Sequence, residues 1–180
     1  IKEIKDSYDN YSFQDIYKTV NNYINSLSTF YLDFTKDILY IESANSYKRR
    51  SVQTVLYEIL TSLIKLLAPI LPYTSEEVYK LLPGEKFESV HLERNPEVIE
   101  YKNSKEILAY WDKFFKIKDD VYKALEEARN EKLIGKGLEA RVYIHADGEY
   151  LDIIEELDKD LKQLLIVSEV VLTEETLTKY

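Results

Sequence analysis

Three consecutive cations, Lys48, Arg49 and Arg50, are the residues of this sequence best suited to bind a charged ligand. No Asp or Glu occupies positions 43–57, so this stretch is locally basic. Arginine can donate two hydrogen bonds in a fork to phosphate oxygens, and a helix N-terminus also attracts anions. Without a ligand, cations at a helix start cost about 0.3–1 kcal/mol per exposed charge. The pattern therefore indicates a phosphate-binding surface, and the alternative is a solvated turn whose cations pair with nearby carboxylates.

A second basic group surrounds a break in the apolar pattern near position 135. It contains Arg129, Lys132, Lys136 and Arg141, and two glutamates interrupt it. The same phosphate chemistry applies, but the interleaved acids make this group the weaker candidate.

Aromatic side chains are abundant, with 16 Tyr, 6 Phe and 1 Trp. Exposed aromatic rings can stack on unpaired nucleic-acid bases. Most of these residues fall on helix faces that are expected to be buried. For Tyr17, Tyr31 and Trp111 the spacing favours packing over base stacking.

The sequence contains no catalytic signature. Cysteine is absent, which excludes disulfides, thiolate metal sites and cysteine nucleophiles. The glycine-rich nucleotide-binding, zinc-protease and serine-hydrolase motifs are absent as well. The two histidines, His91 and His145, lie far apart in the sequence and are expected to be structural. We therefore predict no catalytic residue and no metal ligand in this chain.

The chain has 180 residues, begins at Ile1 and contains no methionine, which predicts that it is a piece of a longer protein. Its composition, with 45% apolar and 32% charged residues, is that of a folded globular protein. No apolar run approaches 18 residues and the N-terminus lacks a signal-peptide core, so neither membrane insertion nor secretion is expected.

The net charge of −9 argues against binding of nucleic acid over the whole protein surface, because such binding relies on cations that neutralise phosphates. The excess acid is nevertheless local. Residues 146–180 hold 3 basic and 10 acidic residues, whereas residues 101–145 hold 10 basic and 8 acidic ones. The acidic C-terminal part is therefore expected to face away from any bound nucleic acid.

Apolar residues recur at steps of three and four over most of the first 134 residues, a period typical of helices that bury one face. Ser12 is the expected N-cap of the first helix, and a polar joint at 42–46 follows that helix. Pro69 should end the second helix, and a capping box at 74–77 should begin the third. The expected helices span about 13–41, 52–67, 75–82 and 104–132, with a long connection over 84–103.

The pattern changes after Gly135. Apolar and polar residues alternate over 140–146, as in a half-buried strand, and helical spacing returns over 150–164. Residues 166–172 are rich in Val, Ile and Leu and predict a second strand. The expected fold is therefore mainly α, with a helix bundle over 1–134 followed by a small α/β unit, of β-α-β type, over 135–180.

Five stretches, taken in order, carry a resemblance to a known family. They are FYLDFTKDILY at 30–40, RRSVQTVLYEI at 49–59, LAPILPYTSEEVY at 67–79, SVHL at 89–92 and ARNEKLIGKGLEARV at 128–142. Together, over about residues 8–172, the chain resembles the anticodon-binding region of class I aminoacyl-tRNA synthetases. LAPILPYTSEEVY fits the wider valyl, leucyl and isoleucyl group, whereas FYLD, KDILY and IGKGLEA favour the bacterial-type isoleucyl-tRNA synthetase family.

Two positions depart from that family. It usually has Trp where this chain has Tyr79, and Ser where this chain has Gly137. Neither change removes a charged contact, but the second is expected to loosen the junction to the α/β unit.

The resemblance implies a role in tRNA selection. In such enzymes this region is a helix bundle that binds the anticodon stem and loop, while ATP-dependent aminoacylation takes place in upstream domains. The HIGH and KMSKS signatures of the ATP site are absent here. The resemblance thus implies no cofactor in this segment, ATP with magnesium elsewhere in the parent enzyme, and zinc only in a tail outside it. The implied partners are isoleucine tRNA and the catalytic domains of the same chain, in a cytoplasmic, monomeric enzyme.

The basic groups and the resemblance coincide. RRS at 49–51 matches the family pattern, so Lys48, Arg49 and Arg50 are the first candidates for phosphate contacts along the anticodon stem. Arg129 and Lys132 are the second, and Lys136 follows. Such contacts would position the RNA, while unpaired bases would be read by hydrogen bonds and stacking.

Two other functions stay open at this point. The equivalent domain of a valyl or leucyl synthetase would change the cognate tRNA but not the mechanism. A helical protein-interaction module without an RNA role is favoured by the overall acidity and by the strongly acidic C-terminal part. An independent enzyme is the weakest alternative, because no nucleophile with a base and no metal set can be assembled from the spacing.

Overall fold

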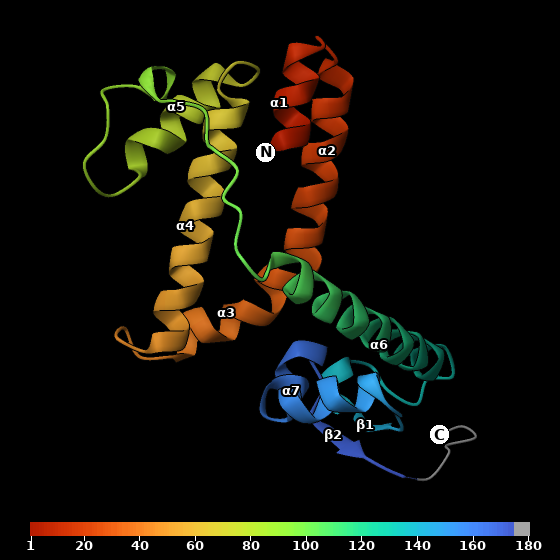
Figure 1. Cartoon of the computed structure of the whole chain (residues 1–180). Helices are drawn as coiled ribbons and strands as arrows, with labels where there is room; N and C mark the ends of the chain where they lie inside the picture. Colours follow the sequence, from red (N-terminus) through yellow and green to blue (C-terminus); the bar gives the residue numbers. More distant parts are fainter. Residues whose placement is uncertain (175–180) are drawn as a thin grey trace. The chain divides into compact units, whose positions relative to one another are not determined.

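A computed structural model describes residues 1–174 of the chain, and these residues divide into two compact units, 1–99 and 100–174 (Figure 1). The first unit is helical. Its elements are α1 (Lys2–Asp9), α2 (Phe13–Ser26), a π-helical segment η1 (Leu27–Tyr31), α3 (Leu32–Ile41), α4 (Tyr47–Leu67), α5 (Pro72–Leu81) and a 3-10 turn η2 (Val90–Leu92). The helix expected over 13–41 is therefore present, with a π-helical segment inside it.

Two small hydrophobic cores of the first unit both use the C-terminal end of α4. On one side, Leu66 packs with Ile4 of α1 and with Ile16 and Val20 of α2. The hydroxyl of Tyr8 donates a hydrogen bond of 2.8 Å to the backbone oxygen of Leu66 and fixes α1 there. The sequence pattern did not predict α1, because eight residues with few apolar side chains give little periodicity.

The second core joins the end of α4 to α5 and η2. Ile64 and Ala68 pack with Tyr79 and Val90. Tyr79 is 2% exposed, and its hydroxyl donates to Glu93 over 2.6 Å. Lys65 of α4 lies 3.0 Å from the other carboxylate oxygen of Glu93. This network fastens the long connection after α5 to the helices.

The start of α5 differs from the predicted capping box. The helix begins at Pro72, a residue favoured in the first helical turn because its missing N–H needs no partner there. Thr74 lies inside the helix rather than at its N-cap. Glu76 instead accepts hydrogen bonds from the Ser89 hydroxyl, at 2.8 Å, and the Val90 amide, at 3.0 Å. These bonds lower the pKa of Glu76.

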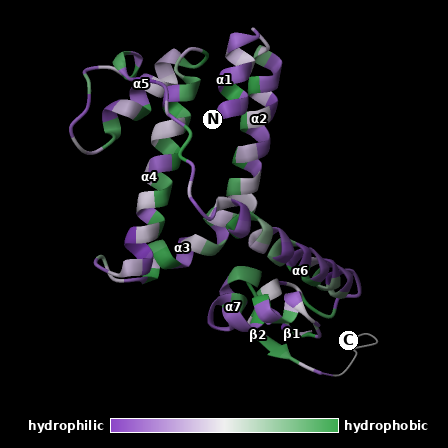
Figure 2. Ribbon diagram, in the orientation of Figure 1, coloured by the Kyte–Doolittle hydropathy of each residue, from purple (hydrophilic) through white to green (hydrophobic). Residues whose placement is uncertain are grey.

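The second unit has the predicted order of elements. They are α6 (Ser104–Asn130), a 3-10 turn η3 (Gly137–Glu139), β1 (Arg141–Ile144), α7 (Glu149–Leu165) and β2 (Glu169–Leu172). The two strands pair in parallel, with Arg141 opposite Glu169 and Ile144 opposite Leu172. Figure 2 shows β2 in the colours of hydrophobic residues. The β-α-β unit that the change of period predicted is therefore confirmed.

The long helix α6 belongs to the same compact unit as these strands. It packs against α7, and its buried residues are Phe114, Ile117, Val121 and Leu125. The predicted division near Gly135 marks the change from helices to α/β structure, whereas the compact units divide before α6.

Gly137 makes a close approach at the junction before β1. A Cβ atom at this position would lie 2.9 Å from the backbone oxygen of Ile166, the left-handed C-cap of α7. Only a residue without a Cβ allows the two backbones this spacing. The packing here is tight, in contrast to the loosening that the sequence suggested.

Candidate nucleic-acid interface

Lys48, Arg49 and Arg50 lie in the first turn of α4, directly after the joint that follows α3. Ser46 is the N-cap, and its hydroxyl accepts a hydrogen bond of 3.4 Å from the amide of Arg49. The first turn contains no acidic residue, so both the free amides and the side chains there present positive charge.

Arg49 has a structural task at this turn. Its side chain is half-buried, and Nη1 donates a hydrogen bond of 2.9 Å to the backbone oxygen of Glu42, the C-cap of α3. The Nε atom is buried and has no hydrogen-bond partner. Arg49 therefore ties the end of α3 to the start of α4, and much of its guanidinium group is withdrawn from solvent.

Arg50 and Lys48 are exposed. Within the described residues the Arg50 guanidinium makes no hydrogen bond or ion pair, while Lys48 does take part in an interaction within the protein. The alternative of a turn whose cations are all neutralised by neighbouring carboxylates therefore does not hold for Arg50. Of the three cations, Arg50 is the one most available to a phosphate.

The second basic group lies at the end of α6. Arg129 Nη1 pairs with Glu126 over 2.9 Å, and Lys132 has a left-handed backbone with φ of 60°. The Lys132 amide bonds to the Arg129 oxygen and the Leu133 amide to the Ala128 oxygen, which completes a Schellman motif. Cations at this helix end are stabilised by the macrodipole without any ligand.

Lys136 follows in the turn before β1, and its side chain is exposed. The backbone amides of Gly135 and Lys136 hydrogen-bond to the Glu139 carboxylate, the first over 2.8 Å, and these bonds lower the pKa of Glu139. The carboxylate is thus held within this basic turn. The structure gathers three predicted site residues at each of two turns, and each turn lies in a different compact unit.

Sequence reasoning placed most tyrosines in the core, and here it was partly wrong. Tyr31 and Trp111 are half-buried, but Tyr17 is 72% exposed. The sequence pattern also did not identify two exposed aromatic residues next to the first basic turn. Tyr40 and Tyr47 are each 87% exposed.

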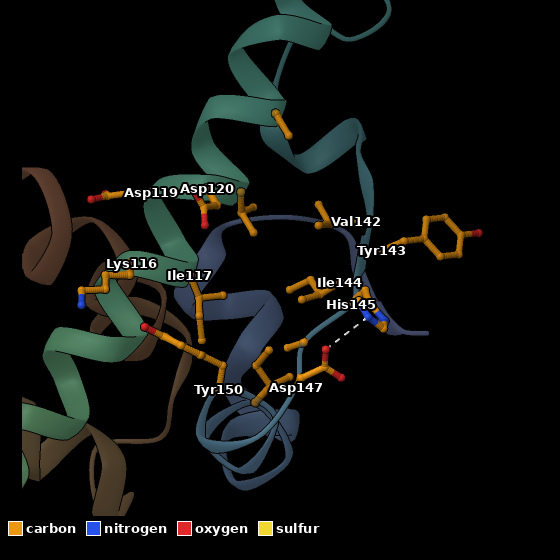
Figure 3. A pocket seen from close by; sticks show the side chains of 14 residues that line it. Lys116, Ile117, Asp119, Asp120, Val142, Tyr143, Ile144, His145, Asp147 and Tyr150 are labelled. Carbon is orange, nitrogen blue, oxygen red and sulfur yellow. Dashed lines mark ion pairs between the residues drawn. The ribbon is translucent and has the colours of Figure 1, made fainter. Parts of the chain in front are cut away.

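A cavity of about 840 Å³ lies in the second unit, between α6, β1 and the start of α7 (Figure 3). Ile117 and Ile144 point into it, whereas Tyr143 and Asp119 point away. His145 lies 3.7 Å from Asp147, and its Nδ1 atom is 3.1 Å from the Thr173 oxygen. Over residues 1–174 no group of acidic or histidine side chains has the arrangement of a metal site. The lining thus combines apolar side chains with charged and polar ones.

No helix in the described part of the chain combines the length and the apolar character needed to cross a membrane.

Comparison with known proteins identifies the class. The profile of the family described as the anticodon-binding domain of tRNA ligase matches residues 1–144. The chain therefore belongs to this family of anticodon-binding domains.

The relatives are more specific. The isoleucine–tRNA ligase of Listeria monocytogenes is 51% identical over 175 residues, which is 97% of this chain and 19% of the relative. The isoleucine–tRNA ligase of Bacillus mycoides is 49% identical over 94% of this chain and 18% of its own length. The isoleucine–tRNA ligase of Streptococcus thermophilus is 48% identical over 97% of this chain and 19% of its own length. The chain thus spans about a fifth of the length of these curated relatives.

Proposed function

We propose that this chain is the segment of an isoleucine–tRNA ligase that binds the anticodon stem and loop of its tRNA. The observation that carries the proposal is its likeness to isoleucine–tRNA ligases over nearly the whole chain, together with the family of its first 144 residues. Activation of isoleucine with ATP and magnesium, and its transfer to tRNA, belong to other domains of the parent enzyme. The segment holds no cofactor, and the parent acts as a cytoplasmic monomer.

Exposed cations supply the physical mechanism. Arg50 and Lys48 at the start of α4 contact phosphates of the anticodon stem, with Arg129, Lys132 and Lys136 as a second set. Phosphate contacts fix the register of the RNA but carry no sequence information. Discrimination among tRNAs therefore requires contacts with unpaired bases, which such positioning makes possible.

A titration tests the proposal. The 180-residue chain is mixed with isoleucine tRNA, with valine tRNA and leucine tRNA, and with an unrelated RNA duplex, at low and moderate salt. We expect the tightest binding to isoleucine tRNA and weaker binding as salt rises, because bound phosphates release counterions. Preference for valine or leucine tRNA would reassign the cognate RNA. Equal binding to all four RNAs without salt dependence would favour the protein-interaction module instead.

A second experiment uses the intact parent enzyme. Arg50→Ala should weaken tRNA binding and leave isoleucine-dependent pyrophosphate exchange unchanged, because the exchange reaction needs no tRNA. Arg49→Ala is the comparison, since Arg49 also holds the turn between α3 and α4. Loss of pyrophosphate exchange in the Arg50 variant would contradict a role confined to RNA binding.

A further inference from the structure

The turn between α3 and α4 presents two aromatic rings beside its cations. Tyr40 lies in the last turn of α3, and Tyr47 is the first residue of α4. Each side chain is 87% exposed. Within the described residues neither ring stacks on another ring or on a cation. The fold therefore leaves two large planar surfaces open to solvent at one short turn.

The residues that carry the rings and the cations lie on two helices that are braced where they join. The turn of five residues, 42–46, joins the two helices, and Arg49 Nη1 reaches back across it to the Glu42 oxygen over 2.9 Å. The Ser46 cap fixes the first turn of α4, from which Tyr47 and Arg50 project. α3 and α4 also pack against each other. The backbone positions of Tyr40 and Tyr47 are thus set relative to that of Arg50.

We propose that Tyr40 and Tyr47 form a stacking platform for unpaired bases of the anticodon loop, with Arg50 contacting the adjoining phosphates. The inference rests on the proposed function and adds to it the residues that meet bases. Proteins that bind single-stranded nucleic acid combine a positive track for the backbone with aromatic rings for the bases. Positions 43–57 hold three cations and no acid, so the stretch around Tyr47 is complementary to RNA, whereas Tyr40 has the carboxylates of Asp37 and Glu42 near it in the sequence. A paired stem cannot use the rings, because its bases are already stacked.

The test compares a hairpin with a duplex. The probe is an RNA hairpin with the anticodon stem and loop of isoleucine tRNA and 2-aminopurine at one loop position at a time. The control is a fully paired duplex of the same length. Wild-type chain should quench the 2-aminopurine fluorescence at one loop position or more. Tyr40→Leu and Tyr47→Leu should each weaken hairpin binding about 5- to 150-fold and reduce the quenching, and leave duplex binding unchanged.

Three variants separate stacking from other effects. Tyr40→Phe and Tyr47→Phe keep the ring and should retain binding and quenching. Tyr73→Leu is the matched control, because Tyr73 is 90% exposed in the same unit but lies on α5, away from the basic turn in sequence. It should bind the hairpin like wild type. Thermal midpoints should be equal for all five variants, since exposed side chains contribute little to stability.

The outcomes distinguish the two proposals. Leucine variants that bind the hairpin like wild type, while wild type still prefers isoleucine tRNA, would overturn the stacking platform and leave the proposed function standing. Leucine variants that weaken hairpin and duplex equally would also overturn it, because the rings would then not be reading unpaired bases. A wild-type chain without preference for the cognate hairpin would remove the proposed function, and the platform with it.

Discussion

Replacing Gly137 with alanine should destabilise the second unit. The added Cβ would lie 2.9 Å from the backbone oxygen of Ile166, closer than van der Waals contact allows. A backbone oxygen cannot swing aside as the end of a side chain can. Ile166 is also fixed, because its amide and that of Val167 close the end of α7 by bonding to the oxygens of Gln163 and Lys162.

The magnitude follows from two opposing effects. Overpacking of this kind costs about 1–3 kcal/mol. Alanine restricts the unfolded chain more than glycine does, which returns about 0.4–1 kcal/mol. The backbone of Gly137 has no positive φ, so alanine adds no conformational strain of its own. Taking the middle of each range, a cost of about 2 kcal/mol less a return of about 0.7 kcal/mol leaves a net loss of about 1.3 kcal/mol. A unit of this size loses about 4–8 °C in midpoint for each kcal/mol.

Trp111 provides the assay, because it is the only tryptophan of the chain and lies on α6 in the second unit. Urea unfolding followed by its fluorescence should show a lower midpoint for Gly137→Ala than for wild type. Gly135→Ala is the matched control. Its Cβ would lie 3.3 Å from a Glu139 carboxylate oxygen, which can move, so a smaller loss is expected. A Gly137→Ala midpoint equal to wild type or to the control would refute the steric argument.

Three further outcomes can be measured. Lys132→Gly should stabilise the second unit by about 0.5–1 kcal/mol, because glycine removes the penalty of the left-handed C′ position. The same change should lower the slope of log K for RNA binding against log salt by about 0.9, because one phosphate contact is lost. An unchanged midpoint of urea unfolding, or an unchanged salt slope, would contradict these roles. Arg49→Ala should cost about 1 kcal/mol through its lost bond to the helix joint, whereas Arg50→Ala should stay within about 0.5 kcal/mol of wild type by urea unfolding; equal losses would argue against a structural role confined to Arg49. Burial is the main cause that raises the pKa of Tyr79 to about 12, and its hydrogen bond to Glu93 is the next. The protonated Tyr79 hydroxyl therefore stabilises the fold fully below pH 10, and this contribution is lost as the pH rises toward 12. Tyr79→Phe should show a shallower fall in unfolding midpoint between pH 9 and 11, and an identical fall would contradict the assignment.

Much of the fold could be predicted because helices and strands are encoded by near neighbours. The end of α4 before Pro69, the end of α5 before Pro83 and the whole of the β-α-β order agree with the sequence pattern. The faces of the helices were harder. In α6 the steps of three and four residues place Leu108, Trp111 and Phe115 on one apolar face, yet Leu108 is 63% exposed and Phe114 is fully buried. A step of one residue turns a helix face by about 100°, and apolar residues on several faces leave the choice to the packing partner.

The sequence predicted the candidate site as a group of charged residues, but it did not predict which of them has a structural role and which is exposed. Three adjacent cations look equivalent in the sequence. The structure separates them, because Arg49 reaches the Glu42 oxygen seven residues back while Arg50 projects into solvent. The exposed rings of Tyr40 and Tyr47 could not be identified, because Tyr is common in cores and at surfaces alike.

By itself the sequence determined the helical segments, the β-α-β order, the two basic turns and the likeness to isoleucyl-tRNA synthetases, all of which depend on residues close together in the chain. Only the tertiary structure decided which of the cationic and aromatic side chains are exposed. It also set the contact of Gly137 with Ile166 and the bond from Tyr8 to Leu66, which join residues 29 and 58 positions apart. Contacts of this kind depend on how segments distant in the sequence pack together, and the spacing of residues within one segment does not determine that packing.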